Sequence, residues 1–271
     1  MMLNVFKRYN NIYKISEVYN TKQQLIKRVK MTNTSNYKCL LASTSTLHQG
    51  KYLEYLLPEL VNLFKNIDEV LFVPFARPSG ISHDAYTQKA NEAFSKIGKK
   101  CVGLHQFNQP IEAIKNAKAI FTGGGNSFVL LNQLYKFDLL DALKQKISNG
   151  TPYLGTSAGS NICGLSIKTT NDMPIVYPPS FDALGIVPFL INPHYLDPIA
   201  NDKHMGETRE TRIKEFMTYN KEMVLGLREG SWLHLENSKI LLKGNLSARL
   251  FHKQSIKEID SGFDLNSVKL N

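Results

Sequence analysis

The segment PYLGTSAGSNICG, residues 152–164, decides the fold of this chain. Its first five residues (152–156) have the apolar character of a buried strand, and its last five (160–164) that of a short helix. Between them, Gly155-Thr156-Ser157-Ala158-Gly159 matches G-x-S-x-G, in which small residues permit a tight strand-to-helix turn that projects a serine hydroxyl into solvent. The pattern predicts a strand–turn–helix unit with Ser157 as a candidate nucleophile, and a purely structural turn is the alternative.

A second glycine-rich turn precedes this segment. Gly123-Gly124-Gly125-Asn126 follows a predicted strand and opens a predicted helix. It fits neither known phosphate-binding pattern, because Ser127 and Phe128 stand where G-x-G-x-x-G needs its last glycine and no Gly-Lys-Ser/Thr follows. The other interpretation is a glycine backbone that donates an N–H to a reacting carbonyl, and the nearby serine turn favours it.

The rest of the chain alternates apolar runs with amphipathic stretches. Near-continuous apolar strands separated by helices are typical of an α/β fold with a mostly parallel sheet flanked by helices. We expect helices at 51–63, at 83–97 with Ser82 as N-cap, from Pro110, and as a pair at 126–149. We expect strands at Tyr37–Ala42, Glu69–Phe75, Lys100–His105, Lys118–Phe121 and Pro152–Thr156, followed by short antiparallel strands at Met223–Arg228, Ser231–Glu236, Lys239–Lys243 and Ala248–Phe251.

Composition limits the remaining classes of protein. The net charge of +10 is concentrated at the start of the chain, since residues 1–30 hold seven bases and one acid, Glu17. We therefore predict a basic, disordered extension at 1–36 and a single α/β domain at 37–271; the extension could also be a targeting segment or the product of an upstream start codon. The domain itself lacks a basic cluster with aromatic residues, so we expect no nucleic-acid partner. We also expect no membrane span, no disulfide framework from three cysteines and a cytoplasmic location.

A serine nucleophile requires a base and an acid that orients the base. Among seven histidines, His194 is distinguished by its setting, because it follows the apolar run 189–191 and the turn pair Asn192-Pro193 at an expected strand end. Glu229 lies just past a predicted strand, beside Gly230. It is either the orienting acid or a turn residue paired with Arg228. The order serine, histidine, glutamate differs from that of the α/β-hydrolases.

These segments resemble peptidase E, the α-aspartyl dipeptidase family of serine peptidases. The resemblance extends over about residues 37–251. It rests on the two glycine-rich turns and on three further stretches: TTNDMPIVYPPSFDALGIVPFLINPH (169–194), GETRETR (206–212) and GLREGSW (226–232). The long middle stretch is far more specific than the serine turn.

The resemblance implies a fold like that of class I glutamine amidotransferases, with serine in place of cysteine. It implies Ser157 as nucleophile, His194 as general base and Glu229 as its orienting acid, with the N–H groups of Gly125 and Ala158 as the oxyanion hole. The substrate would be a dipeptide with an N-terminal aspartate, and no metal or other cofactor is expected.

Two further residues are expected to bind the substrate: Arg209, which the resemblance singles out in the GETRE stretch, and Asn126. Burying the aspartate carboxylate is costly unless a cation meets it, and an arginine fork suits a carboxylate. A solvated charge ladder of Glu207, Arg209, Glu210 and Arg212 is the other interpretation of that stretch.

Two other functions stay open from the sequence. A related serine hydrolase of the cyanophycinase type would share the serine turn but not the 169–194 and 206–212 stretches. A catalytically inactive binding module would keep the fold, although all three triad positions are filled here. The oligomeric state is left open.

Overall fold

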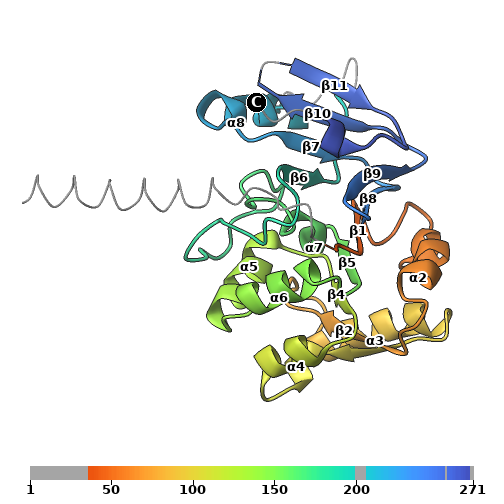
Figure 1. Cartoon of the computed structure of the whole chain (residues 1–271). Coiled ribbons are helices and arrows are strands. Elements are labelled where there is room, and N and C mark those ends of the chain that lie inside the picture. Colours follow the sequence, from red (N-terminus) through yellow and green to blue (C-terminus); the bar gives the residue numbers. More distant parts are fainter. Residues whose placement is uncertain (1–35, 199–205, 254, 269–271) are drawn as a thin grey trace, which may run out of the picture. The chain divides into compact units, whose positions relative to one another are not determined.

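The computed structural model describes residues 36–198, 206–253 and 255–268, and the predicted extension at 1–36 lies outside these except for its last residue. A seven-stranded sheet in the order β3-β2-β4-β5-β1-β8-β9 forms the centre (Figure 1). Its first five strands are parallel, and β8 and β9 are antiparallel to their neighbours. The strands are β1 (Cys39–Ala42), β2 (Glu69–Val73), β3 (Lys100–Gly103), β4 (Ile120–Thr122), β5 (Tyr153–Thr156), β8 (Ser231–Glu236) and β9 (Lys239–Gly244).

Helices cover both faces of this sheet, because its parallel strands are apolar on both sides. In β1, Cys39 and Leu41 belong to the core under α4, α5, α6 and α7, whereas Leu40 and Ala42 belong to the core under α2 and α3 (Figure 1). The helices are α2 (Leu57–Leu63), α3 (His83–Ser95), α4 (Pro110–Asn116), α5 (Ser127–Lys136), α6 (Leu140–Ser148) and α7 (Ala158–Asn161), with short 3-10 turns at Glu54–Leu56, Leu104–Gln106 and Leu265–Ser267.

A second sheet of four strands has the order β11-β10-β7-β6. Its members are β6 (Leu190–Pro193), β7 (Val224–Leu227), β10 (Ala248–His252) and β11 (Ser255–Ile259). One face, with Ile191 and Leu225, joins the core beneath α5 and α6. The other face, with Leu190 and Val224, packs against Ile213 of α8 (Arg209–Tyr219).

The expected α/β architecture is confirmed, and so is the Ser82 cap, whose hydroxyl accepts a hydrogen bond from the N–H of Ala85. Two local expectations were wrong. The strand expected at Lys100–His105 ends at Gly103, because His105 lies in a 3-10 turn. The strand expected at Met223–Arg228 is antiparallel to β10 but parallel to β6. The split of the late strands between two sheets was not expected.

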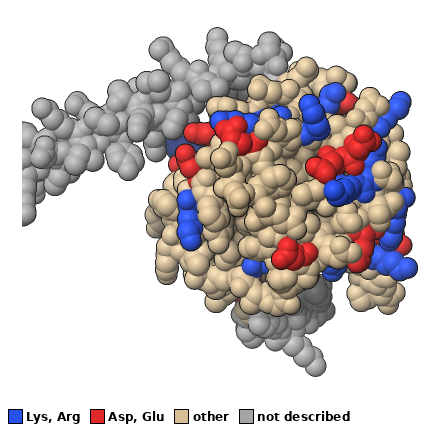
Figure 2. All heavy atoms as spheres, turned by 90° about the horizontal axis from the view of Figure 1, so that it is seen from below, with Lys and Arg blue, Asp and Glu red and all other residues tan. Residues whose placement is uncertain are grey.

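Charged side chains do not gather into one basic area on the face seen in Figure 2, where acidic and basic residues are interspersed and a broad area carries neither. Among the helices that the structure describes, none is long and apolar enough to cross a membrane.

Candidate active site

Ser157 lies in a strained turn at the carboxyl end of β5. Its backbone has φ 53° and ψ −113°, a conformation that L-residues rarely adopt, between the last residue of β5 and the first of α7. The Ser157 N–H donates to the Ala42 carbonyl at 3.0 Å, which fixes the turn to the end of β1. A Cβ on Gly159 would lie 2.1 Å from the Thr122 carbonyl oxygen, so the turn needs a glycine there. The serine elbow predicted from the sequence is confirmed as a turn.

Ser157, His194 and Glu229 form one continuous hydrogen-bonded chain. The Oγ of Ser157 lies 2.8 Å from His194 Nε2, and His194 Nδ1 lies 2.6 Å from Glu229 Oε1. This geometry suits the imidazole tautomer that donates its Nδ1 proton to the carboxylate and accepts from the serine hydroxyl. The side chains of His194 and Glu229 are 36% and 44% exposed, so the chain opens onto the surface. Arg228 does not pair with Glu229, because its guanidinium binds Asp197 and Glu258 instead.

His194 and Glu229 come from adjacent parallel strands of the smaller sheet. His194 follows β6 and Glu229 lies two residues past β7, and these strands end side by side at Pro193 and Leu227. His194 itself has φ 54°, and its N–H donates to Ser43 Oγ at 2.8 Å. The same hydroxyl donates to the Leu227 carbonyl at 2.7 Å. One buried serine at the end of β1 therefore joins the larger sheet to the two strands that carry the base and the acid.

The glycine-rich turn after β4 lies against the serine elbow. Gly125 has φ 145°, and a Cβ there would lie 2.2 Å from the Ala76 carbonyl oxygen, so only glycine fits. A Cβ on the preceding Gly124 would lie 3.5 Å from Ser157 Oγ, which shows how closely this backbone approaches the serine. Among the described residues, the N–H groups of Gly125 and of Ala158, the first residue of α7, have no hydrogen-bond acceptor. Both are free to bind a ligand oxygen.

Asn126 uses both ends of its side chain within the protein. Its Oδ1 accepts from the N–H of Val129 at 3.0 Å and caps α5, and its Nδ2 donates to the Met173 carbonyl at 2.9 Å. The structure therefore gives Asn126 a role in holding the turn. Its expected contact with substrate stays a prediction, for which one N–H of Nδ2 is left.

Arg209 is the first residue of α8 and is half-buried. Burial and then the like charge of Arg212 lower the pKa of Arg209, while Asp172 is close enough to oppose them. Asp172 in turn accepts a hydrogen bond of 2.7 Å from the N–H of Ser127, two residues past Gly125. The charge ladder is only partly present, because Glu210 pairs with Lys214 and Arg249 instead of a neighbouring arginine of its own helix.

Sequence reasoning missed two residues of the site, Ser43 and Asp172. Ser43 directly follows the buried strand β1, and ligands of parallel sheets sit at such carboxyl ends, so its position was a usable signal. Asp172 carried no such signal, because the Ser127 N–H that it binds is 45 residues away in the chain.

Among the described residues, no group of three or more His, Cys, Asp and Glu side chains is placed to hold a metal ion. The Ser157–His194–Glu229 chain lies where the carboxyl ends of β5, β6 and β7 meet.

Comparison with known proteins gives a consistent result. The model of "Peptidase family S51" matches residues 39–243. The chain is 45% identical to peptidase E of Streptomyces coelicolor, over 84% of this chain and 93% of the relative. It is 48% identical to the "Probable alpha-aspartyl dipeptidase" of Drosophila melanogaster, over 78% of this chain and 88% of the relative.

A solved structure supports the same architecture. The crystal structure of a peptidase from an acI-B1 Actinobacterium superposes with a TM-score of 0.63 at 15% identity, covering 88% of this chain and 99% of that one. At this identity the similarity establishes the fold alone. The match of the family model over most of the chain, together with the two close relatives, establishes that the chain belongs to peptidase family S51.

Proposed function

We propose that this serine-type dipeptidase hydrolyses dipeptides with an N-terminal aspartate, with Ser157 as nucleophile, His194 as general base and Glu229 as the acid that orients His194. The single observation that supports this most strongly is the unbroken chain of hydrogen bonds from Ser157 through His194 to Glu229, at 2.8 and 2.6 Å. A nucleophile bonded to a base, which is bonded to a third group, is the arrangement that serine hydrolases share on unrelated folds.

In the proposed reaction, His194 takes the Ser157 proton as Oγ attacks the peptide carbonyl carbon. The tetrahedral intermediate collapses, the C–N bond breaks, and His194 gives its proton to the leaving amino acid. The aspartyl group then remains as an ester on Ser157. A water molecule, deprotonated by His194, attacks this ester and releases aspartate.

The oxyanion of this intermediate would be bound by the N–H groups of Gly125 and Ala158. Both groups are free among the described residues, and the Gly124–Gly125 backbone is held against Ser157. Ala158 also opens α7, so its N–H points outward from a helix N-terminus. Preorganised donors of this kind typically contribute about 10²–10³ in rate each.

Arg209 is the residue that we propose to recognise the aspartate side chain. It is half-buried at the start of α8, and the Asp172 carboxylate partly balances its charge. A substrate carboxylate would be a stronger partner, because the arginine fork can bind it through two parallel hydrogen bonds. The relative from Drosophila melanogaster carries the name of an α-aspartyl dipeptidase, which is consistent with this assignment.

A panel of four dipeptides tests the proposal: Asp-Leu, Glu-Leu, Asn-Leu and Leu-Leu, each assayed with and without EDTA. We expect Asp-Leu to be cleaved with the highest kcat/KM and EDTA to have no effect. Cleavage of Leu-Leu as fast as Asp-Leu would contradict the proposed specificity. Loss of activity in EDTA would contradict the proposed mechanism.

A further inference from the structure

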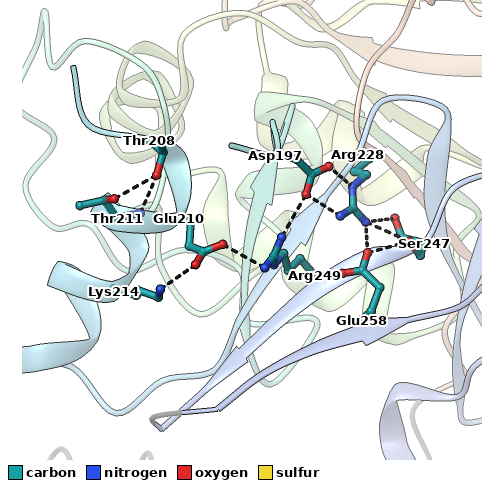
Figure 3. A network of polar contacts seen from close by, with 9 residues as sticks. All are labelled: Asp197, Thr208, Glu210, Thr211, Lys214, Arg228, Ser247, Arg249 and Glu258. Carbon is teal, nitrogen blue, oxygen red and sulfur yellow. Dashed lines mark hydrogen bonds and ion pairs between the residues drawn. The ribbon is translucent and has the colours of Figure 1, made fainter. Parts of the chain in front are cut away.

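An ionic network lies between the smaller sheet and α8 (Figure 3). At its centre is Arg228, one residue before Glu229, whose side chain is only 14% exposed. Its Nε and Nη2 donate to the two oxygens of Asp197, both at 2.7 Å, which is a bidentate pair. Its Nη1 donates to the carbonyl and the hydroxyl of Ser247 and pairs with Glu258. Further members are Arg249, Glu210 and Lys214.

Each member of the bidentate pair is a near neighbour in sequence of one proposed triad residue. Asp197 is three residues after His194, and Arg228 immediately precedes Glu229. The pair therefore joins the two loops that leave the parallel strands β6 and β7. Tyr195 also connects these two loops. Its N–H donates to the Leu227 carbonyl at 3.1 Å, and the Arg228 guanidinium lies 5.7 Å from the centre of its ring.

Glu229 itself has little else to hold it. Its carboxylate is 44% exposed, and among the described residues its only hydrogen bond is the one to His194. Glu229 and Gly230, whose φ is 94°, are the two central residues of a turn that starts at Arg228 and is closed by a hydrogen bond of 3.1 Å from the Ser231 N–H to the Arg228 carbonyl. Ser231 is held at the far end of this turn by the Ser43 N–H, which donates to the Ser231 carbonyl at 3.1 Å, so the direction of the Glu229 side chain depends on how firmly the near end, residue 228, is fixed.

We propose that Arg228 is a positioning residue of the active site, which holds Glu229 against His194 by binding Asp197 bidentately. This inference rests on the proposed triad. A misplacement of about 1 Å in a catalytic group can cost about 10²-fold in rate. We therefore expect Arg228→Met to lower kcat for Asp-Leu about 10- to 100-fold with a much smaller change in KM.

A double-mutant cycle separates positioning from a general structural effect. Arg228→Met is measured in the wild-type protein and in Glu229→Ala, with long incubations for the slow variants. If Arg228 acts through Glu229, its effect on kcat should shrink to within about twofold once Glu229 is absent. An equal loss in both backgrounds would overturn the proposal, as would wild-type kcat in Arg228→Met.

Three further variants sharpen the test. Asp197→Asn should show the same dependence on Glu229, and it provides the cycle if Arg228→Met fails to fold. Arg228→Lys keeps the charge but cannot form the fork, so it should recover little activity; full recovery would contradict positioning by geometry. Arg249→Met is the matched control, because it removes another arginine that reaches Asp197, at 3.3 Å, from β10. Its effect should be the same with and without Glu229.

A measurement without substrate tests the role of Arg228 independently of the proposed function. The proton that His194 shares with Glu229 should give a low-field NMR signal, assigned by its absence in Glu229→Ala. We expect this signal to broaden or move upfield in Arg228→Met and to persist in Arg249→Met. An unchanged signal in Arg228→Met would contradict positioning, whichever substrate the enzyme cleaves.

Discussion

Ser43 Oγ accepts a hydrogen bond of 2.8 Å from the backbone N–H of His194, and so connects the end of β1 to the proposed base. The same hydroxyl donates to the Leu227 carbonyl. Because His194 has a positive φ, its unusual backbone depends on such a partner. Proper placement of the base thus depends on a residue about 150 positions earlier in the chain.

Replacing this serine tests the connection. Ser43→Ala leaves the His194 N–H without its acceptor, which should cost about 1–3 kcal/mol of stability. It also removes one of the two donors to the Leu227 carbonyl, which keeps the Tyr195 N–H. The rate on Asp-Leu should fall as well, because His194 loses its fixed position. Thermal unfolding and steady-state kinetics measure both effects. Ser45→Ala is the control, because the Ser45 hydroxyl makes no hydrogen bond among the described residues. This variant should change neither the unfolding temperature nor the rate on Asp-Leu.

The Gly125 turn gives a second prediction. Gly125→Ala should lower stability by about 1–3 kcal/mol from backbone strain alone, and the contact with the Ala76 carbonyl adds to this cost. It should also lower kcat, because the N–H proposed for the oxyanion hole moves. Gly80→Ala is the matched control, since Gly80 also has a positive φ but open space around it. That variant should cost about 1–2 kcal/mol and leave kcat unchanged. Equal kinetics for the two variants would argue against an oxyanion role for Gly125.

Substrate specificity gives a third prediction. Arg209→Met should lower the rate on Asp-Leu by about 10²-fold or more, the scale of a lost charge-assisted pair. The preference for Asp-Leu over Asn-Leu should shrink with it. Arg212→Met, an exposed arginine on the same helix, is the control. If Arg209→Met slowed both substrates equally, or neither, Arg209 would not be the residue that recognises aspartate.

The pair of Asp197 and Arg228 gives a prediction for the stability of the protein at low pH. Hydrogen bonds from Arg228 hold the pKa of Asp197 below its ordinary value of 3.8. A carboxylate with a lowered pKa in the folded state stabilises the fold at pH values above its unfolded pKa, and this contribution is lost as pH falls through the folded pKa. The unfolding temperature of the wild type should therefore drop as pH is lowered from about 5 to about 2.

In Asp197→Asn the unfolding temperature should be lower near neutral pH and should fall less steeply in acid. Asp260→Asn removes an exposed carboxylate whose side chain makes no hydrogen bond or ion pair among the described residues, and it should follow the wild-type curve. Parallel curves for wild type and Asp197→Asn would show that the pair does not contribute.

Much of the fold could be predicted from the sequence, because the parallel strands are apolar on both faces and their helices have clear signals such as the Ser82 cap. The serine turn was also predictable, because its small residues lie between a predicted strand and a predicted helix. The division of the late strands into two sheets was not, since β7 pairs with β6 across a chain separation that no local pattern reports. β11 escaped prediction because Ser255–Ile259 is largely exposed and lacks a clear apolar alternation.

Within the site, His194 and Glu229 were candidates from their places at strand ends, the resemblance assigned Glu229 its role, and the structure brings both together with Ser157. Ser43, Asp172 and the bond between Asp197 and Arg228 were not identified, because each depends on contacts between distant parts of the chain. For Asn126, the structure shows a helix cap that the sequence analysis did not consider. The predicted extension at 1–36 stays a prediction.

The central claim is that Ser157 is the nucleophile, and hydrolysis of Asp-Leu by Ser157→Ala tests it most directly. Removing the nucleophile of a triad costs about 10⁴–10⁶ in rate. The account predicts a loss of this size while circular dichroism and the unfolding temperature stay close to those of the wild type. Turnover of Asp-Leu by a folded Ser157→Ala at a rate near that of the wild type would contradict it.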